Sequence, residues 1–526
     1  MRVMPIVTCA GASPAIHSPF MPPCHTGPMH PELDPIAFFR ELLAADPGAA
    51  PVRASLAAAL LAAGALADAI AEATAALAVA PGRLDARLTR AEAHRRRHDH
   101  AAAILDLHQA ARLAPERAAI HHALGAALAE TDALAEAAGA LRRAAALAPA
   151  QADVAATLGS VLLRQGEWRD AEAATRHALS LDPTLAIAHR NLAALLERRD
   201  PAASRRHREL GFAGRSLEII EAPEPLLRVL VLCATGDGNI PLRHLLPPRR
   251  ITVLRWYVAY ARAEQVGALP DYDLILNAIG DPERMPALPA AVARILAAPP
   301  RPLLNPPEQV ARTSRVMLPR LLDGIPGILV PTTRGDAAVT LPALVRPLGA
   351  HGGEGVVLTR TPAERDAALA AAGAATLTQY IDCRDPDGWF RKYRVIFIDR
   401  VPYPYHLAIS PHWLVHYWTA GMAGDPVRRA EEAQFLTDPA AALGAAGWAA
   451  LGAIGARLDL DFAGIDFGLR ADGRLVVFEA NATMLVHPET DPVFAYRNGA
   501  VAAILAAFQT LLARRQAGPM PGNAAA

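Results

Sequence analysis

Small and apolar residues recur in phase along the first third of the chain, ahead of prolines that stand 34 residues apart. Leu124-Gly125, Ala137 and Ala144 precede Pro149, and the same kinds of residue stand at the same distances before Pro183 and Pro81: Leu158-Gly159, Ala171 and Ala178, and Leu56-Ala57, Ala69 and Ala76. Small residues let paired helices approach closely, and a proline ends the second helix before the next pair begins. The pattern therefore predicts a series of antiparallel helix pairs. The prolines are Pro47, Pro81, Pro115, Pro149 and Pro183.

A period of 34 residues is that of tetratricopeptide repeats, so this part of the chain resembles a tetratricopeptide array. We expect four full repeats from Ala50 to Ala186, an opening helix from Pro35 to Ala45 and a closing helix from Ile187 to Arg199. Repeat arrays present a concave surface that binds other chains, which predicts a protein or peptide partner. His94 and His98 are four residues apart, but no glutamate stands between them as in the zinc motif, so we expect surface histidines.

Short apolar runs alternate with helical patterns in the middle of the chain, after a charged stretch from Arg199 to Arg215 that breaks the period. Strands that alternate with helices indicate a mostly parallel sheet. Glu221 to Pro225 is typical of a linker ahead of this sheet. The expected strands are Arg228 to Cys233, Ile251 to Val258 and Asp273 to Ile279, and the expected helices are Ala287 to Ala297 and Glu308 to Leu322.

A glycine-rich loop follows, between strands that begin at Leu344 and resume at Val356. Such a loop can fold over phosphates and offer backbone N–H groups, although a glycine hairpin without a ligand has the same pattern. Further strands are expected at Thr376 to Ile381, at Tyr403 to Ser410 and at Trp413 to Trp418. A strand that opens near Arg391 places Lys392 and Arg394 on one face. A helix is expected from Pro439 to Leu458.

The stretch from Phe462 to Met484 predicts a β-hairpin that carries oxygen ligands. Glu479 and Asn481 are two residues apart and share one face of a strand, and Asp466 lies on the partner strand. Two carboxylates and an amide oxygen suit Mg²⁺, whose shell is commonly completed by nucleotide phosphates. A surface hairpin with ordinary turn acids is the alternative.

Composition narrows the class of protein. The formal net charge of +0 argues against a general binder of nucleic acid or of anionic membranes. The four cysteines have no metal-ligand or redox spacing, so we expect reduced thiols and a cytoplasmic protein. We expect no apolar run long enough to span a membrane. Lys392 is the single lysine among 52 basic residues, which favours a role that needs a compact ammonium.

The order of glycine-rich loop, hinge strand, basic strand and Asp466, Glu479 and Asn481 resembles the ATP-grasp fold. The resemblance covers about Leu227 to Arg515 and implies a multidomain chain: an all-α tetratricopeptide solenoid, an α/β pre-domain and an α+β ATP-grasp-like domain. The boundaries we expect are a disordered leader over 1–32, the array over 33–212, a linker over 213–226, the pre-domain over 227–332, the ATP-grasp-like domain over 333–515 and a disordered tail over 516–526.

The resemblance also implies roles for individual residues. Asp466, Glu479 and Asn481 would hold Mg²⁺ against ATP, Gln379, Tyr380 and Ile381 would form the hinge that reads adenine, and Asp382 would lie near the ribose. Gly352 and Gly353 belong to the loop over the phosphates. Arg346 and Arg315 stand where the family has phosphate-binding lysines. Arg394 and Lys392 would stabilise the transferred phosphoryl group, and His406, His416 and Trp418 are candidates for the acceptor pocket.

The activity implied is that of an ATP- and Mg²⁺-dependent carboxylate–amine ligase that works through an acyl phosphate, with the array recruiting a protein or peptide. The substrate would be a small-molecule or peptide carboxylate and amine. An alternative is a nucleotide-binding adaptor without catalysis, because arginine replaces lysine at both positions. A glycosyltransferase is disfavoured, because the α/β half has no sugar-nucleotide pattern. Neither nucleic acid nor membrane is expected as a partner.

Overall fold

The computed structural model describes residues 34–236, 238–282, 288, 290–334, 339–348, 353 and 355–517. The predicted leader, and the predicted tail beyond residue 517, lie outside this part. The chain forms two compact units. One comprises the chain up to Leu226 together with residues 248–252, and the other comprises Leu227–Pro247 and the chain from Val253 onward.

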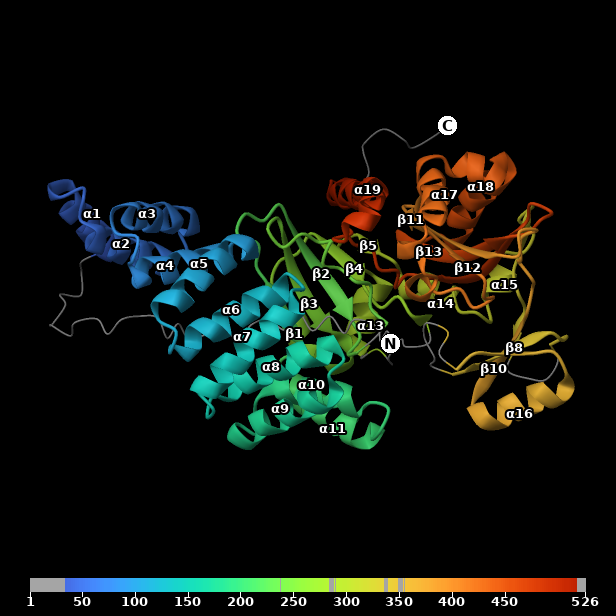
Figure 1. The fold of residues 1–526 in the computed structure, drawn as a ribbon, viewed down its shortest axis with the longest axis horizontal. Coiled ribbons are helices and arrows are strands. Elements are labelled where there is room, and N and C mark those ends of the chain that lie inside the picture. Colours follow the sequence, from blue (N-terminus) through green and yellow to red (C-terminus); the bar gives the residue numbers. More distant parts are fainter. Residues whose placement is uncertain are drawn as a thin grey trace. The chain divides into compact units, whose positions relative to one another are not determined.

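The first unit is a series of antiparallel helix pairs that resembles a tetratricopeptide array (Figure 1). The predicted opening helix is confirmed, since α1 spans Pro35–Ala45. The stretch from Arg199, which breaks the period, forms α11, whose Ala203 packs with Leu192 and Leu196 of α10. The remaining helices are α2 (Ala50–Ala62), α3 (Leu66–Val79), α4 (Leu84–Arg96), α5 (His100–Leu113), α6 (Ala118–Glu130), α7 (Leu134–Leu147), α8 (Ala152–Gln165), α9 (Trp168–Leu181), α10 (Ala186–Leu196) and α11 (Pro201–Phe212).

Small residues hold the two helices of a pair close together. A Cβ atom on Gly125 of α6 would lie 2.5 Å from Cγ of Leu141 in α7, so a larger residue would force the helices apart. A Cβ atom on Gly159 of α8 would likewise lie 2.5 Å from Oγ1 of Thr175 in α9. These recurring small positions, together with fully buried alanines such as Ala137, explain why the array packs with few large side chains.

A basic side chain also holds the carbonyl oxygen of the proline that precedes each repeat. Arg87 donates to the oxygen of Pro81 at 2.7 Å, and Nε2 of His121 lies 2.9 Å from the oxygen of Pro115. Arg53 and His189 occupy the equivalent position in their repeats and contact Pro47 and Pro183. Where that position is alanine, His177 of the following helix contacts Pro149 instead. Several histidines of the array therefore serve its fold.

A parallel sheet opens the second unit and confirms the expected alternation of strands and helices. β3, β2, β4 and β5 are neighbours in that order, and β2, β4 and β5 run parallel. The predicted helix from Glu308 to Leu322 is two short helices, because Pro319 has no N–H and starts a new turn. The elements are β2 (Leu227–Cys233), β3 (Ile251–Tyr257), α12 (Ala263–Val266), β4 (Leu274–Asn277), α13 (Ala290–Ala297), β5 (Leu303–Leu304), α14 (Pro307–Ala311) and α15 (Leu318–Leu321), while β1 (Leu217–Ile220) precedes them.

A small antiparallel sheet follows in the order β7-β10-β8-β9, with α16 packed on it (Figure 1). Ala368 and Leu369 of α16 pack against Val345 and Leu377 of the sheet. The elements are β7 (Thr333–Arg334), β8 (Ala343–Pro347), β9 (Val357–Thr359), α16 (Pro362–Ala372) and β10 (Ala375–Gln379).

The largest sheet has the order β12-β11-β13-β14-β6. Tyr393 and Phe467 on one face pack against Phe435 of α17, and α18 joins the same core (Figure 1). On the other face Phe462 packs against Phe508 of α19. The elements are β6 (Ile328–Leu329), β11 (Phe390–Ile398), β12 (Val401–Ser410), α17 (Pro426–Thr437), α18 (Pro439–Leu458), β13 (Phe462–Leu469), β14 (Leu475–Asn481) and α19 (Asn498–Gln516), with 3₁₀ turns η1 (Val258–Tyr260), η3 (Tyr417–Thr419), η4 (Met422–Gly424) and η5 (Pro492–Arg497).

Two expectations for this region are wrong. No strand forms over Trp413 to Trp418, because the N–H of His412 donates to Oγ of Ser410 and turns the chain out of the sheet after β12. Among the described helices, α18 is long and apolar enough to cross a membrane by length and composition, although no such stretch was expected. Its buried Leu451 and Ile454 lie in the core of the sheet, which accounts for its apolar character.

Candidate functional site

The predicted hairpin is confirmed. β13 and β14 pair antiparallel, and Asp466 stands directly opposite Glu479. Gly473 makes the turn with φ +81°, a conformation that favours glycine, and its N–H donates to the oxygen of Arg470 at 2.9 Å. The two carboxylates therefore share one face of the sheet.

A row of four polar residues crosses the sheet at this level. Arg394 of β11 pairs directly with Asp466 on one side and with His406 of β12 on the other. Directly paired residues of neighbouring strands point to the same face, so the row runs His406, Arg394, Asp466, Glu479. Lys392 joins that face because it lies two residues before Arg394.

The row is bordered by two β-bulges, one on β12 beside His406 and one on β14 beside Glu479. Between Arg394 and Val395 the partner in β12 changes from His406 to Pro404, which leaves Tyr405 without a partner residue across the strands. Between Asp466 and Phe467 the partner in β14 changes from Glu479 to Val477, which leaves Phe478 as the extra residue. Bulges re-aim side chains and are frequent beside active sites.

The bulge in β14 turns Phe478 toward the face that carries the row. A Cβ atom on Gly468, which lies two residues after Asp466, would be 2.9 Å from the ring of Phe478 and 3.0 Å from Cβ of Cys383. Strict alternation along β14 assigns Phe478 and Glu479 to opposite faces, so no pattern in the sequence pointed to Phe478 as a residue of this face. Phe478 is the aromatic neighbour of the row that sequence reasoning missed.

Asp466 is held by two cations. Arg394 grips it with both branches of its guanidinium, Nε to Oδ1 at 2.5 Å and Nη2 to Oδ2 at 2.8 Å, and Nζ of Lys392 lies 3.2 Å from Oδ2. Burial opposes ionisation of this carboxyl, but Arg394 and Lys392 outweigh burial and hold its pKa far below the usual range. Asp466 is therefore a charged acceptor whose two oxygens are both engaged.

Glu479 is held from outside the sheet. Arg315, which lies between α14 and α15, forms an ion pair with Oε2 of Glu479. Burial and the neighbouring Asp466 raise the pKa of Glu479, whereas Arg315 and Arg346 lower it, and the net direction is downward. Arg346 comes from β8 of the small sheet, so cations from three separate segments of the chain act on the two carboxylates.

Asn481, predicted as the third metal ligand, makes a local turn with Thr483. Its Oδ1 accepts hydrogen bonds from the N–H of Thr483 at 2.9 Å and from its hydroxyl at 3.0 Å. This local turn engages the oxygen that was expected to bind a metal. Among the described residues, no three His, Cys, Asp or Glu side chains are grouped to hold a metal ion. Asp466 and Glu479 still offer the hard oxygens that Mg²⁺ prefers.

The predicted hinge runs from the end of β10 toward the row. The N–H of Tyr380 donates to the oxygen of Pro342, and its ring meets Trp413 edge-on at 6.0 Å. Burial raises the pKa of Tyr380 to about 12. Oδ1 of Asp382 accepts from the N–H of Arg384 at 3.0 Å. Gln379 ends β10, Ile381 follows Tyr380, and Cys383 brings the segment against Gly468 of β13.

The glycine loop reaches the same region at Gly353. This residue has φ +78°, and a Cβ atom on it would lie 2.8 Å from Nε2 of His416. Gly352 lies outside the described residues. Burial, followed by Lys392, lowers the pKa of His416. The described part of the loop thus contacts a histidine that also senses the charges of the row.

His406 ends the row in an aromatic setting. Its ring lies 5.4 Å from that of Tyr405 and 5.1 Å from that of Tyr417, and Nδ1 has no hydrogen-bond partner among the described residues. Burial, followed by Arg394, lowers the pKa of His406 well below its ordinary value. His406 is therefore a neutral imidazole beside a charged pair. Trp418 lies in η3, after His416 and Tyr417.

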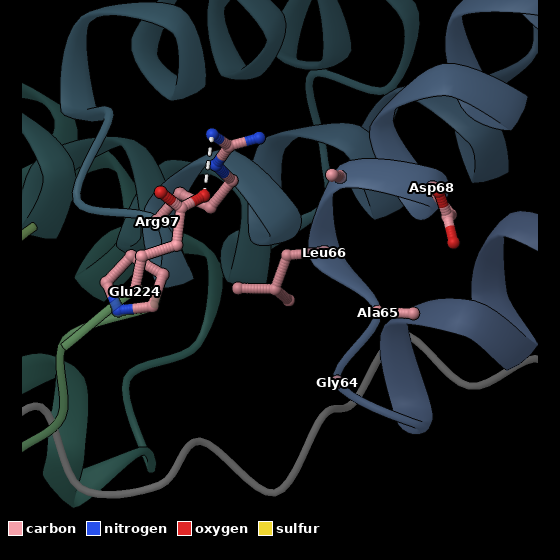
Figure 2. Close-up of a pocket in the computed structure, with 8 residues that line it drawn as sticks. Gly64, Ala65, Leu66, Asp68, Arg97 and Glu224 are labelled. Carbon is pink, nitrogen blue, oxygen red and sulfur yellow. Dashed lines mark ion pairs between the residues drawn. The ribbon is translucent and has the colours of Figure 1, made fainter.

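A cavity of about 210 Å³ lies elsewhere, in the helical unit (Figure 2). It is bordered by the start of α3, and Arg97 and Glu224 form an ion pair beside it at 3.8 Å. Its lining includes none of the residues predicted from the hairpin, the loop or the hinge.

Neither a family model nor a curated protein matches this chain. Solved structures of repeat proteins are similar to its helical part. One is YrrB, a TPR protein described as having an unusual peptide-binding site. Its sequence is 17% identical, the match covers 34% of this chain and 92% of YrrB, and the TM-score is 0.31. A MamA protein is 21% identical over 31% of this chain and 90% of its own, with a TM-score of 0.30. PilF of Pseudomonas aeruginosa is 22% identical, the match covers 31% of this chain and 76% of PilF, and the TM-score is 0.29. TM-scores this low carry no argument, so the likeness of this region to a tetratricopeptide array rests on its helix pairs and its 34-residue period.

Proposed function

We propose that the second unit is an ATP-grasp-like ligase that binds ATP with Mg²⁺ and joins a carboxylate to an amine. The observation that carries this proposal is the row of His406, Arg394, Asp466 and Glu479 between two bulges, with cations arriving from other elements. A sheet that only packs a core has no need of buried charges, since these are expensive to desolvate unless they are paired or used.

The hinge side of the row suits the nucleotide base. Backbone groups of Gln379 to Asp382 would read adenine, and Phe478 offers an apolar ring beside Cys383 of the same segment. Aromatic rings stack on bases without demanding further polar partners. The order along the sheet would then be base at the hinge, phosphates over the carboxylates and acceptor near His406.

Two carboxylates of the row are suited to bind a divalent metal ion. Asp466 and Glu479 would hold Mg²⁺, while Asn481 contributes through its turn with Thr483 rather than as a ligand. Bound there, Mg²⁺ supplies charge neutralisation for the phosphates.

The cations of the site would stabilise the negative charge of the phosphates. Arg346, Arg315 and Lys392 would bind phosphate oxygens, and Arg394 would stabilise charge on the transferred group. In the first step a carboxylate oxygen attacks the terminal phosphorus, and ADP leaves. In the second step the amine nitrogen attacks the carbonyl carbon, the carbon–oxygen bond to phosphate breaks, and the amine gives up a proton.

The helical array would recruit the protein or peptide that carries one of the reacting groups. Tetratricopeptide-like arrays bind other chains on an extended concave surface. In this proposal the array selects the substrate and the second unit modifies it.

A second candidate function is nucleotide binding without turnover. It is favoured by arginine at both positions where the resemblance expects lysine, and by the ion pair that already joins Arg315 to Glu479. Arg346→Lys distinguishes the two candidates. A ligase with a weakened phosphate site gains ATP affinity from this change, whereas a repurposed site does not.

The test is ADP release by the purified full chain, with Mg²⁺-ATP and a pool of amino acids and short peptides as acceptors. We expect Glu479→Gln to lower the rate at least about a hundredfold, the range for loss of an electrostatic catalytic group. Arg391→Gln is the control, since Arg391 lies on β11, the strand of Arg394, but pairs with Asp385 and Glu431 away from the row. ADP release and ATP binding that are unchanged by Glu479→Gln contradict the proposal.

A further inference from the structure

The carboxylates that would hold the metal are already engaged by cations of the chain itself. Both oxygens of Asp466 are taken, by Arg394 at 2.5 Å and 2.8 Å and by Lys392 at 3.2 Å. Oε2 of Glu479 is taken by Arg315. Because Asp466 is only 3% exposed, water does little to weaken these pairs.

The cluster nevertheless has more positive than negative charge. Arg315, Arg346, Lys392 and Arg394 contribute four positive charges, and Asp466 and Glu479 contribute two negative ones, which leaves an excess of two. A partly buried excess of positive charge of this size attracts a polyanion. Guanidinium groups bind phosphate as readily as carboxylate, with the same paired geometry.

We propose that these cations mask the metal site, and that a diphosphate-bearing ligand unmasks it by drawing Arg394, Lys392 and Arg315 from the carboxylates to its own oxygens. The inference rests on the proposed function, because it concerns the same ligand and the same two acids. The ligand class is a nucleoside diphosphate or triphosphate together with a divalent cation. Neither component reaches full affinity without the other.

The exchange has a thermodynamic consequence. Without the phosphates, a cation that approaches Asp466 must displace Arg394 and Lys392 into a site that already has excess positive charge. With the phosphates bound, those side chains have new partners and the carboxylates regain their lone pairs. Each ligand therefore raises the affinity of the other by the same factor, as linkage requires.

The probes are Mn²⁺ and ADP, titrated separately and together into the full chain, with bound Mn²⁺ measured by electron paramagnetic resonance. For the native chain we expect Mn²⁺ alone to bind at least about tenfold more weakly than in saturating ADP, within the range of coupled sites. In Arg394→Gln we expect Mn²⁺ alone to bind about tenfold more tightly than in the native chain, while ADP binds more weakly.

Two further variants keep the test decisive. Arg315→Gln removes the cation that pairs with Glu479 and lies outside the large sheet. If Arg394→Gln fails to fold, this variant still tests whether an arginine of the chain weakens Mn²⁺ binding. Arg391→Gln is the control and should behave like the native chain. A double variant, Asp466→Asn with Glu479→Gln, measures the Mn²⁺ that ADP carries by itself.

The outcomes separate the two proposals. Mn²⁺ affinity that is the same with and without ADP, or that neither Arg394→Gln nor Arg315→Gln changes, overturns the masking proposal and leaves nucleotide binding intact. Failure of the native chain to bind ADP at all overturns the proposed function, and the masking proposal with it. Tightened Mn²⁺ binding in both arginine variants but not in Arg391→Gln supports the exchange.

Discussion

The helical array and the large sheet use arginine and histidine in different ways. In the array these residues recur at one repeat position, where Arg87 and His121 hold the carbonyl oxygens of Pro81 and Pro115. In the sheet Arg394 and His406 occur once, side by side, in a row that includes two acids and is bordered by two bulges. A polar residue that repeats with the architecture serves the fold, whereas a polar row placed where strand alternation fails is the stronger functional candidate.

The largest effect that we expect on stability comes from breaking the row. Asp466→Ala leaves Arg394 and Lys392 in a partly buried setting without their acid, which should lower the free energy of unfolding of the second unit by about 3 kcal/mol. Chemical denaturation followed by tryptophan fluorescence measures the change. Asp472→Ala in the turn of the same hairpin is the control and should cost much less, because its ion pair with Arg474 is exposed to solvent. A stability that is equal in the two variants would show that the ion pairs of Asp466 do not stabilise the second unit.

A smaller effect is expected from breaking the array. Gly125→Val places new atoms where even a Cβ lies 2.5 Å from Leu141, so α6 and α7 must separate, at about 2 kcal/mol for an overpacked core. Gly139→Ala, in α7, has open space around the new methyl group and should instead raise stability slightly. Thermal unfolding followed by circular dichroism distinguishes the pair. Two variants with the same midpoint would contradict the close packing of the helices.

The smallest effect concerns His406 and pH. Burial, followed by Arg394, keeps the pKa of His406 well below its ordinary value, and Lys392, Arg497 and Asp466 also act on it. The unfolded chain therefore binds a proton below about pH 6.5 that the folded chain refuses, so stability falls as pH falls. At pH 5.5 the loss from this residue should be on the order of 1 kcal/mol. His406→Gln should flatten the slope between pH 6.5 and 5.5, and a slope equal to that of the native chain contradicts this environment.

The sequence predicted much of this structure because two signals are local. The proline period predicted the helix pairs of the array, and period-two alternation with a glycine turn predicted the hairpin that sets Asp466 opposite Glu479. The grouping of Arg315 and Arg346 around Glu479 depends on segments far apart in the chain, and only the resemblance pointed to it.

The rest depended on geometry that a linear pattern does not encode. Each bulge adds one residue to one strand, so Phe478 joins the face of Glu479 although the two are adjacent in sequence. Asn481 was assigned to the metal, but Thr483 two residues later competes for its oxygen. The strand expected over Trp413 to Trp418 does not form, because the N–H of His412 donates to Oγ of Ser410 and turns the chain after β12.

The central claim is that the row on the large sheet binds a nucleotide together with a divalent cation. Calorimetric titration of ATP in millimolar Mg²⁺ into the full chain tests it most directly, with Glu479→Gln and the control Arg391→Gln measured in parallel. We expect saturable binding to the native chain and to Arg391→Gln, and at least about a tenfold loss of affinity in Glu479→Gln. Absence of binding to the native chain, or equal affinity in all three proteins, would contradict the account.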